Sequence, residues 1–177
     1  MKKFELTSEF VTFLGKKLFR IKALISFGNV KEGELGGYVE KEENLSNDGN
    51  AWVYGDARVS GDARVSGNAR VYGDARVYGD AEVFGNARVY GDARVYGDAR
   101  VSGNADYATV HGFGSEYRTT TFFRTKAGDI GVRCGCFYGT LEEFRAKVKE
   151  THGETKTAKE YLMVADLMEF RFSKEEA

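Results

Sequence analysis

One six-residue phrase, Val-(Tyr/Ser/Phe)-Gly-(Asp/Asn)-Ala-(Arg/Glu), fills the middle of the chain without interruption. It runs in register from Val53 to Asp106 and occurs nine times. A short fixed period is typical of solenoid architectures, in which each repeat packs only against its neighbours in the stack. The repeat therefore constrains the fold far more tightly than it constrains an activity.

The residue order within the phrase predicts a strand followed by a corner. Ala and Val alternate with Arg and an aromatic or Ser residue, which predicts a strand with Ala and Val facing inward. The Gly-Asp or Gly-Asn pair predicts a corner, because Gly tolerates a positive φ and Asp or Asn can bond its local backbone. Three consecutive repeats would supply the three sides of one triangular coil.

A second period supports an 18-residue coil. Asn replaces Asp at every third corner, at Asn50, Asn68, Asn86 and Asn104. Only a coil of this length stacks Asn on Asn, and stacked amides can bond one another along the axis, whereas stacked carboxylates repel. The sequence thus predicts a mainly β fold, with a left-handed parallel β-helix over residues 47–115.

Two different patterns flank the repeats. An N-terminal β cap is predicted over residues 1–46, because alternating segments on either side of Leu14–Lys17 indicate a hairpin. A small C-terminal α+β module is predicted over residues 116–177. Residues 110–112 keep the register of the repeat, which predicts one further strand on the coil.

The C-terminal module shows the signals of two strands followed by two helices. Residues 119–125 and 130–137 are predicted strands. Capping boxes that begin at Thr140 and Thr157 predict the two helix starts. Apolar faces on both helices would pack inward, and they are formed by Leu141, Phe144 and Val148 in the first helix and Tyr161, Leu162, Ala165 and Met168 in the second.

Charge and composition disfavour several classes of partner. The 177 residues carry a net charge of −1, which gives no overall attraction to nucleic acid or anionic lipid. No apolar run approaches the ~20 residues of a membrane span, and no secretory signal is expected at the start. Cys134 and Cys136 lie too close for an ordinary structural disulfide, which favours a reducing compartment. We therefore expect a cytoplasmic protein with no membrane partner.

The entry to the repeats resembles that of a known family. The segments that carry the resemblance are Arg20–Leu24, Phe27–Val30, Gly36–Glu40, Asn44–Ser46 and Gly49–Trp52. They resemble YdcK-like left-handed β-helix proteins, which occur in bacteria and, in short forms, in phages and prophages. The tail, Cys134–Phe144, resembles the end of short phage proteins of this type. The resemblance implies a phage or prophage accessory protein, a class that includes inhibitors of bacterial defence, and it implies no activity.

The candidates for catalysis lie outside the repeats. Many left-handed β-helix proteins are acyltransferases that use a His base beside coenzyme A. The repeats hold no His, and His111 follows the last perfect coil. We expect no catalytic residue and no cofactor, and a hexapeptide-type acyltransferase with His111 as base is an alternative.

Cys134, Cys136 and His152 are the candidates for metal binding. A strand would place both thiols on one face, and the imidazole could supply a third zinc ligand. Burial of two small residues against the helices is the alternative explanation. No metal site is predicted.

Arg and aromatic residues supply the candidate binding surface. Because residues 18 apart stack on one another in successive coils, the residues of each outer face can be listed from the sequence. The face richest in hot-spot residue types consists of Trp52, Tyr54, Arg70, Tyr72, Arg88 and Tyr90. On another face, Phe84 is predicted to project as a knob for self-association. Cross-coil stacking that merely stabilises the coils is the alternative explanation.

The sequence therefore predicts a non-enzymatic interaction module that binds itself, as a homo-oligomer, or a host or phage protein through its Arg/Tyr ladders. Nucleic acid is disfavoured as a partner, because the repeats hold seven Arg against eight acidic residues. An inhibitor of anti-phage defence, acting by protein capture or by sequestering a small signal, is a further alternative.

Overall fold

The computed structural model describes residues 1–173 and divides into two compact units. The first unit ends at Asn104 and the second begins at Ala105. The division lies before residue 116, at which we predicted the C-terminal module to begin. Each unit has its own sheets and its own core, so the two are described separately.

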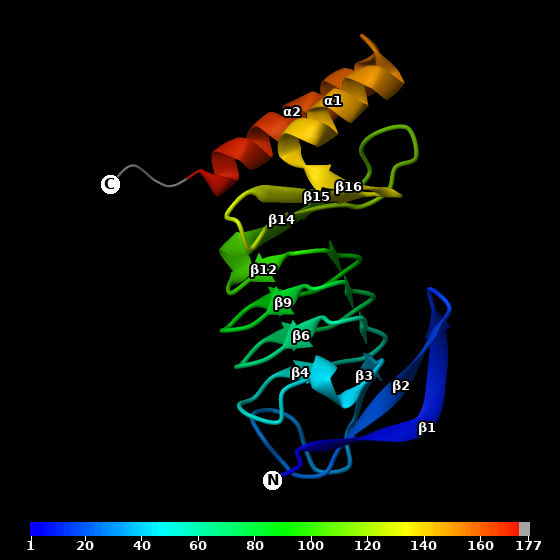
Figure 1. Cartoon of the computed structure of the whole chain (residues 1–177), viewed down its shortest axis with the longest axis vertical. Coiled ribbons are helices and arrows are strands. Elements are labelled where there is room, and N and C mark those ends of the chain that lie inside the picture. The colour runs from blue at the N-terminus through cyan, green and yellow to red at the C-terminus, as the bar shows by residue number, and fades with distance from the viewer. Residues whose placement is uncertain (174–177) are drawn as a thin grey trace. The chain divides into compact units, whose positions relative to one another are not determined.

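The first unit winds the repeats into coils with three sides (Figure 1). One side stacks β4 (Trp52–Val53), β7 (Arg70–Val71) and β10 (Arg88–Val89). The second side contains β5 (Arg58–Val59), β8 (Arg76–Val77) and β11 (Arg94–Val95). The third side stacks β6 (Arg64–Val65), β9 (Glu82–Val83) and β12 (Arg100–Val101). All these neighbours are parallel, and each residue pairs with its counterpart three repeats later.

The strands span only two residues, whereas the alternation predicted four. Each side nevertheless donates two N–H groups to the next coil, as Arg70 does to Ala87 and Tyr72 to Val89. From Val53 to Val101, every Val and Ala of the repeat is fully buried, whereas Ala105 in the last repeat is exposed. The corners require glycine. Gly79, for example, has a φ of +73°, and an added Cβ would lie 2.9 Å from the amide nitrogen of Gly97. These features confirm a parallel β-solenoid with coils of three repeats, and its left-handed winding stays a prediction.

The N-terminal segment forms the predicted hairpin and joins it to the coils. Strands β1 (Phe4–Phe13) and β2 (Lys16–Ala23) pair antiparallel around Leu14 and Gly15, both of which have positive φ. Strand β3 (Leu35–Val39) pairs antiparallel with β2 and parallel with β5. The hairpin therefore extends the second side of the solenoid into one continuous sheet, which is coloured blue at its start in Figure 1.

Side-chain donors close the N-terminal edge of the solenoid. Each coil donates its N–H groups to the carbonyls of the following coil, so the first edge exposes carbonyl oxygens that need donors. Asn44, at the end of the short helix η1 (Glu42–Asn44), donates its amide to the carbonyls of Gly61 and Ala63 at 3.0 and 2.9 Å. The Lys3 ammonium donates to the carbonyl of Ala51 at 2.9 Å. Both contacts satisfy a strand edge that could otherwise pair with another chain.

We expect Lys3 to make the free energy of unfolding of the first unit depend on pH in the alkaline range. Its side chain is buried, and burial lowers its pKa from 10.5 to about 8, against a smaller opposing effect of Asp48. Between these two values the unfolded chain binds more protons than the folded chain, so stability rises with pH. The full change in pKa corresponds to about 3 kcal/mol. Because the ammonium group keeps a hydrogen bond to the carbonyl of Ala51, we expect only about 1–2 kcal/mol of this change.

Urea unfolding between pH 7.5 and pH 10.5 measures this effect when the chain is compared with Lys3→Met, which cannot titrate there. The free energy of unfolding of the unmodified chain should rise relative to that of the variant. A constant difference across this range would contradict the assignment of Lys3 as a buried titrating cap.

The second unit is a four-stranded antiparallel sheet covered on one side by two helices (Figure 1). Its strands are β13 (Tyr107–Val110), β14 (Thr120–Arg124), β15 (Ile130–Cys134) and β16 (Phe137–Thr140), and they are joined in that order. The helices are α1 (Leu141–His152) and α2 (Lys156–Phe172). Within the described residues, no helix is long and apolar enough to cross a bilayer.

Three predictions about this unit are wrong in detail. The strand predicted over residues 130–137 is two strands, β15 and β16, so Cys134 and Cys136 do not lie on one face of a single strand. Residues 110–112 do not add a strand to the coil, because Val110 is the last residue of β13, which pairs antiparallel with β14 from Tyr107 opposite Phe123 to Val110 opposite Thr120. Helix α2 is capped by Thr155, which accepts from the amide of Ala158, and not by Thr157, which lies inside the helix. The capping box at Thr140 is confirmed.

Candidate interaction surface

The second side of the solenoid is already occupied by the N-terminal hairpin. Phe13, at the end of β1, meets the ring of Tyr78 edge-on with centroids 5.7 Å apart. The guanidinium of Arg76 lies 5.2 Å from the centroid of Phe13. Tyr78 is consequently buried. This side of the repeat serves the internal packing of the unit.

The first side carries the predicted ladder of Tyr and Arg residues. Tyr72 and Tyr90 stack with centroids 5.4 Å apart and planes 17° apart. Tyr90 is 53% exposed, Arg88 is exposed, and Tyr54 and Arg70 are half-buried. Burial raises the pKa of Tyr54, and the nearby Arg70 partly opposes that rise. We call Tyr54, Arg70, Tyr72, Arg88 and Tyr90 the tyrosine face.

Trp52 does not belong to this surface, which corrects our prediction. It pairs in register with Arg70, as the period of the coil requires, but it stands in the first coil beneath the N-terminal cap. Phe4 and Phe27 meet its ring edge-on at centroid distances of 6.3 and 5.4 Å. Trp52 is fully buried, so it stabilises the cap and cannot contact a partner.

Phe84 is also placed differently from the prediction. It lies on the third side, as expected, but it is half-buried. The guanidinium of Arg100 lies over its ring, 5.1 Å from the centroid. This cation–π contact covers the ring, so Phe84 does not project as a knob.

The predicted Asn ladder is confirmed over its first three members. Asn50 donates its amide to the side-chain oxygen of Asn68 at 3.1 Å, and Asn68 donates to Asn86 at 3.2 Å. Asn104 leaves the pattern, and its side-chain oxygen accepts from the amide nitrogen of Arg88 at 2.9 Å. Because the ladder forms the corner that precedes Arg70 and Arg88, it holds the border of the tyrosine face in a fixed register.

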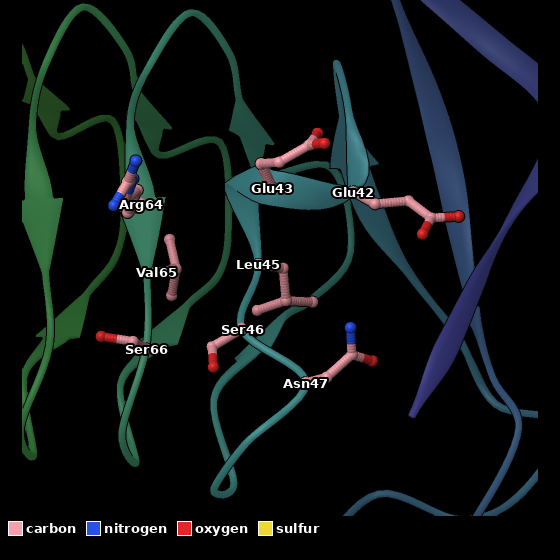
Figure 2. Close-up of a pocket in the computed structure, with 8 residues that line it drawn as sticks. All are labelled: Glu42, Glu43, Leu45, Ser46, Asn47, Arg64, Val65 and Ser66. Atoms are coloured by element: carbon pink, nitrogen blue, oxygen red, sulfur yellow. The ribbon is translucent and has the colours of Figure 1, made fainter. Parts of the chain in front are cut away.

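An open groove of about 630 Å³ lies at the N-terminal end of the third side, where Leu45 bridges to Val65 (Figure 2). The groove is lined by residues of η1, by the residues that follow η1, and by β6 with the next residue, Ser66. These residues are Glu42, Glu43, Leu45, Ser46, Asn47, Arg64, Val65 and Ser66. Figure 2 shows Leu45 beside Val65, with the carboxylates of Glu42 and Glu43 directed away from the serine hydroxyls. The carboxylates and the serine hydroxyls of the lining are therefore not directed toward one another.

Helix α2 carries an exposed apolar stripe that our sequence reasoning missed. Met163, Leu167 and Phe170 are 71%, 56% and 79% exposed. Their spacing of four and three residues places them on one face of the helix. That spacing was visible in the sequence, but the buried residues of α2 give a second apolar pattern that obscured it. We call these three residues the α2 stripe.

The remaining candidates lie in the second unit. His111 is exposed, and its ring nitrogen Nδ1 lies 2.9 Å from the hydroxyl of Thr119, so the ring lies on the surface beside the start of β14. Cys134, Cys136 and His152 line one cavity. Among residues 1–173, however, no three His, Cys, Asp or Glu side chains are arranged to hold a metal ion.

Parallel strands stacked coil on coil around a Val and Ala core define the first unit as a β-solenoid. Its repeats match the family model described as the YdcK β-solenoid repeat, over residues 51–67, 63–79, 69–83 and 93–105. The chain thus carries YdcK-type solenoid repeats, as the resemblance predicted. The matches lie in the repeats, leave residues 84–92 unmatched, and do not include the hairpin or the sheet and helices of the second unit. A comparison with curated proteins found no match.

Proposed function

We propose that the chain is a non-enzymatic interaction module that binds a protein partner through the tyrosine face. The carrying observation is the stacked pair of Tyr72 and Tyr90 on a side of the solenoid that the hairpin leaves uncovered. Tyr and Arg are among the side chains that most often dominate binding energies at protein interfaces.

The rigidity of the tyrosine face favours binding. Its backbone is held by hydrogen bonds between coils, and the neighbouring corner is held by the Asn ladder. Rings that are already ordered lose little conformational freedom when a partner binds. The guanidinium groups of Arg70 and Arg88 border the rings, which favours a partner that offers carboxylates beside an apolar contact.

A capture experiment tests this function. The immobilised chain is incubated with bacterial lysate, and the retained proteins are quantified by mass spectrometry. The triple variant Tyr54→Ser, Tyr72→Ser, Tyr90→Ser should retain at least tenfold less of the specific partner, because about 1–3 kcal/mol is lost for each anchoring ring. Circular dichroism verifies that the variant is folded.

Tyr117→Ser with Tyr138→Ser is the matched control, since these tyrosines are exposed in the second unit. The control should retain the partner at the level of the unmodified chain. Equal retention by the triple variant, or an equal loss in the control, would contradict the tyrosine face as the binding surface. On the resemblance of the tail, we further propose a cytoplasmic setting and a phage or prophage accessory role.

We also propose that two copies of the chain pair through the α2 stripe. Glu160 and Arg171 lie on the same flank of the stripe, about three helical turns apart. In an antiparallel pair of α2 helices, Glu160 of each copy would face Arg171 of the other, so the contact repeats by twofold symmetry. Burial of Met163, Leu167 and Phe170 supplies the apolar contribution.

A further inference from the structure

Both cysteines line a cavity of about 270 Å³ in the second unit. Cys134, at the end of β15, is half-buried, and Cys136 is exposed. The hydroxyl of Thr120 donates to the sulfur of Cys134 at 3.2 Å, and the hydroxyl of Tyr161 lies 3.9 Å from the same sulfur. One thiol is therefore open to reagents in solvent, and the other lies beside it within the protein.

The backbone between the two thiols is a tight turn. Cys134 pairs with Phe137 across β15 and β16, which leaves Gly135 and Cys136 as a two-residue hairpin loop. Gly135 has a φ of +58°, the conformation that such loops require. Even in an extended strand, residues two apart have Cα atoms about 6.6 Å apart, and a turn brings them closer. The pair thus falls within the range of about 4.4–6.8 Å at which disulfides form.

Basic side chains line the cavity that holds the thiols. The guanidinium of Arg118 lies against Gly135, so close that an added Cβ would collide with it. Lys147 and His152 line the same cavity, and Glu116 pairs with Arg118 at 3.5 Å. Positive groups at the cavity attract anionic reagents such as glutathione.

We propose that Cys134 and Cys136 are a reversible dithiol–disulfide pair that exchanges with low-molecular-weight disulfides such as oxidised glutathione. The Cys136 thiolate attacks one sulfur of the reagent, so a mixed disulfide forms and one glutathione thiolate leaves. The Cys134 thiolate then attacks the sulfur of Cys136, closes the intramolecular disulfide and releases the second glutathione. Two protein thiols are oxidised, one disulfide is reduced, and the two thiol protons pass to the released glutathione thiolates.

Closing the bond would replace the Cys134 thiol, which now accepts a hydrogen bond from Thr120, by a disulfide sulfur. Such a short ring strains the disulfide, so the bond should be readily reduced again, in contrast to a structural disulfide. The cavity therefore changes its lining with the thiol redox state of its surroundings.

Mass spectrometry of the intact chain after incubation with oxidised glutathione tests the proposal. The unmodified chain should lose two hydrogen atoms and carry no lasting adduct, and dithiothreitol should reverse the change. Cys134→Ser should accumulate one glutathione at Cys136, because the resolving thiol is absent. Cys136→Ser should react at least tenfold more slowly than Cys134→Ser, because Cys134 is half-buried.

Two results would overturn the proposal: a lasting glutathione adduct on the unmodified chain, or no reaction at either thiol. Arg118→Gln separates an activated thiol from one that is merely exposed. It should slow the reaction of Cys136 about threefold or more by removing a positive charge that attracts the anionic reagent. An unchanged rate would exclude activation by the cavity.

Discussion

Replacing Trp52 with alanine should lower the free energy of unfolding by about 3–5 kcal/mol. The indole is fully buried between the first coil and the N-terminal cap, where Phe4 and Phe27 pack edge-on against it. Its removal leaves a cavity at the point where the irregular cap begins the regular coils. Urea unfolding followed by circular dichroism measures the loss.

Trp52→Phe is the control, because it keeps an aromatic ring in the site. It should retain most of the stability, since the indole Nε1 has no hydrogen-bond partner among the described residues and its loss breaks no bond. If Trp52→Ala cost no more than a typical surface substitution, about 0.5 kcal/mol, the burial of Trp52 under the cap would be wrong.

The double variant Leu167→Glu, Phe170→Glu should convert a dimer into a monomer. Two carboxylates in the centre of an apolar contact would have to be desolvated without partners, which should raise the dimer dissociation constant more than a hundredfold. Neither residue belongs to the buried core of the second unit, so the fold should be retained. Light scattering coupled to size-exclusion chromatography measures the mass in solution.

Ala146→Glu is the matched control for this variant, because Ala146 is exposed on α1 and also acquires a carboxylate on a helix. It should remain dimeric. A monomeric unmodified chain at about 100 µM, or a double variant that stays dimeric, would contradict pairing through the α2 stripe. If the triple Tyr→Ser variant lost both the dimer and the captured partner while the double variant of α2 lost neither, both interactions would be assigned to the solenoid.

The sequence predicted the coils because the period of each residue type reports its position directly. Counting along the repeat gives the register of the coils. The structure agrees, because Val77 and Ala75 are buried and Asn50 donates a hydrogen bond to Asn68. The same counting predicted that Trp52 is exposed on the outer face, and that prediction is wrong. The register is correct, but the cap that covers Trp52 comes from Phe4 and Phe27, which no repeat places in space.

Non-local contacts account for the other differences. The role of Lys3 depends on the carbonyl of Ala51, which is distant in the sequence, so nothing near Lys3 in the chain marks it as an edge cap. Strand β13 has an alternation that suits either a coil or a sheet, and its pairing with β14 decides between them. The tyrosine face could be predicted because it lies within the repeat, whereas the α2 stripe could be separated from the core of α2 only once the packing of the second unit was known.

Site-specific photo-crosslinking tests the tyrosine face as a binding surface most directly. Tyr72→p-benzoylphenylalanine places the reactive ketone on that face, and Tyr138→p-benzoylphenylalanine places it on an exposed ring of the second unit. On irradiation in bacterial cells, the position-72 variant should yield a discrete crosslinked product with a protein partner, and the position-138 variant should not. Absence of any product from position 72, or the same product from position 138, would contradict the proposed interaction module.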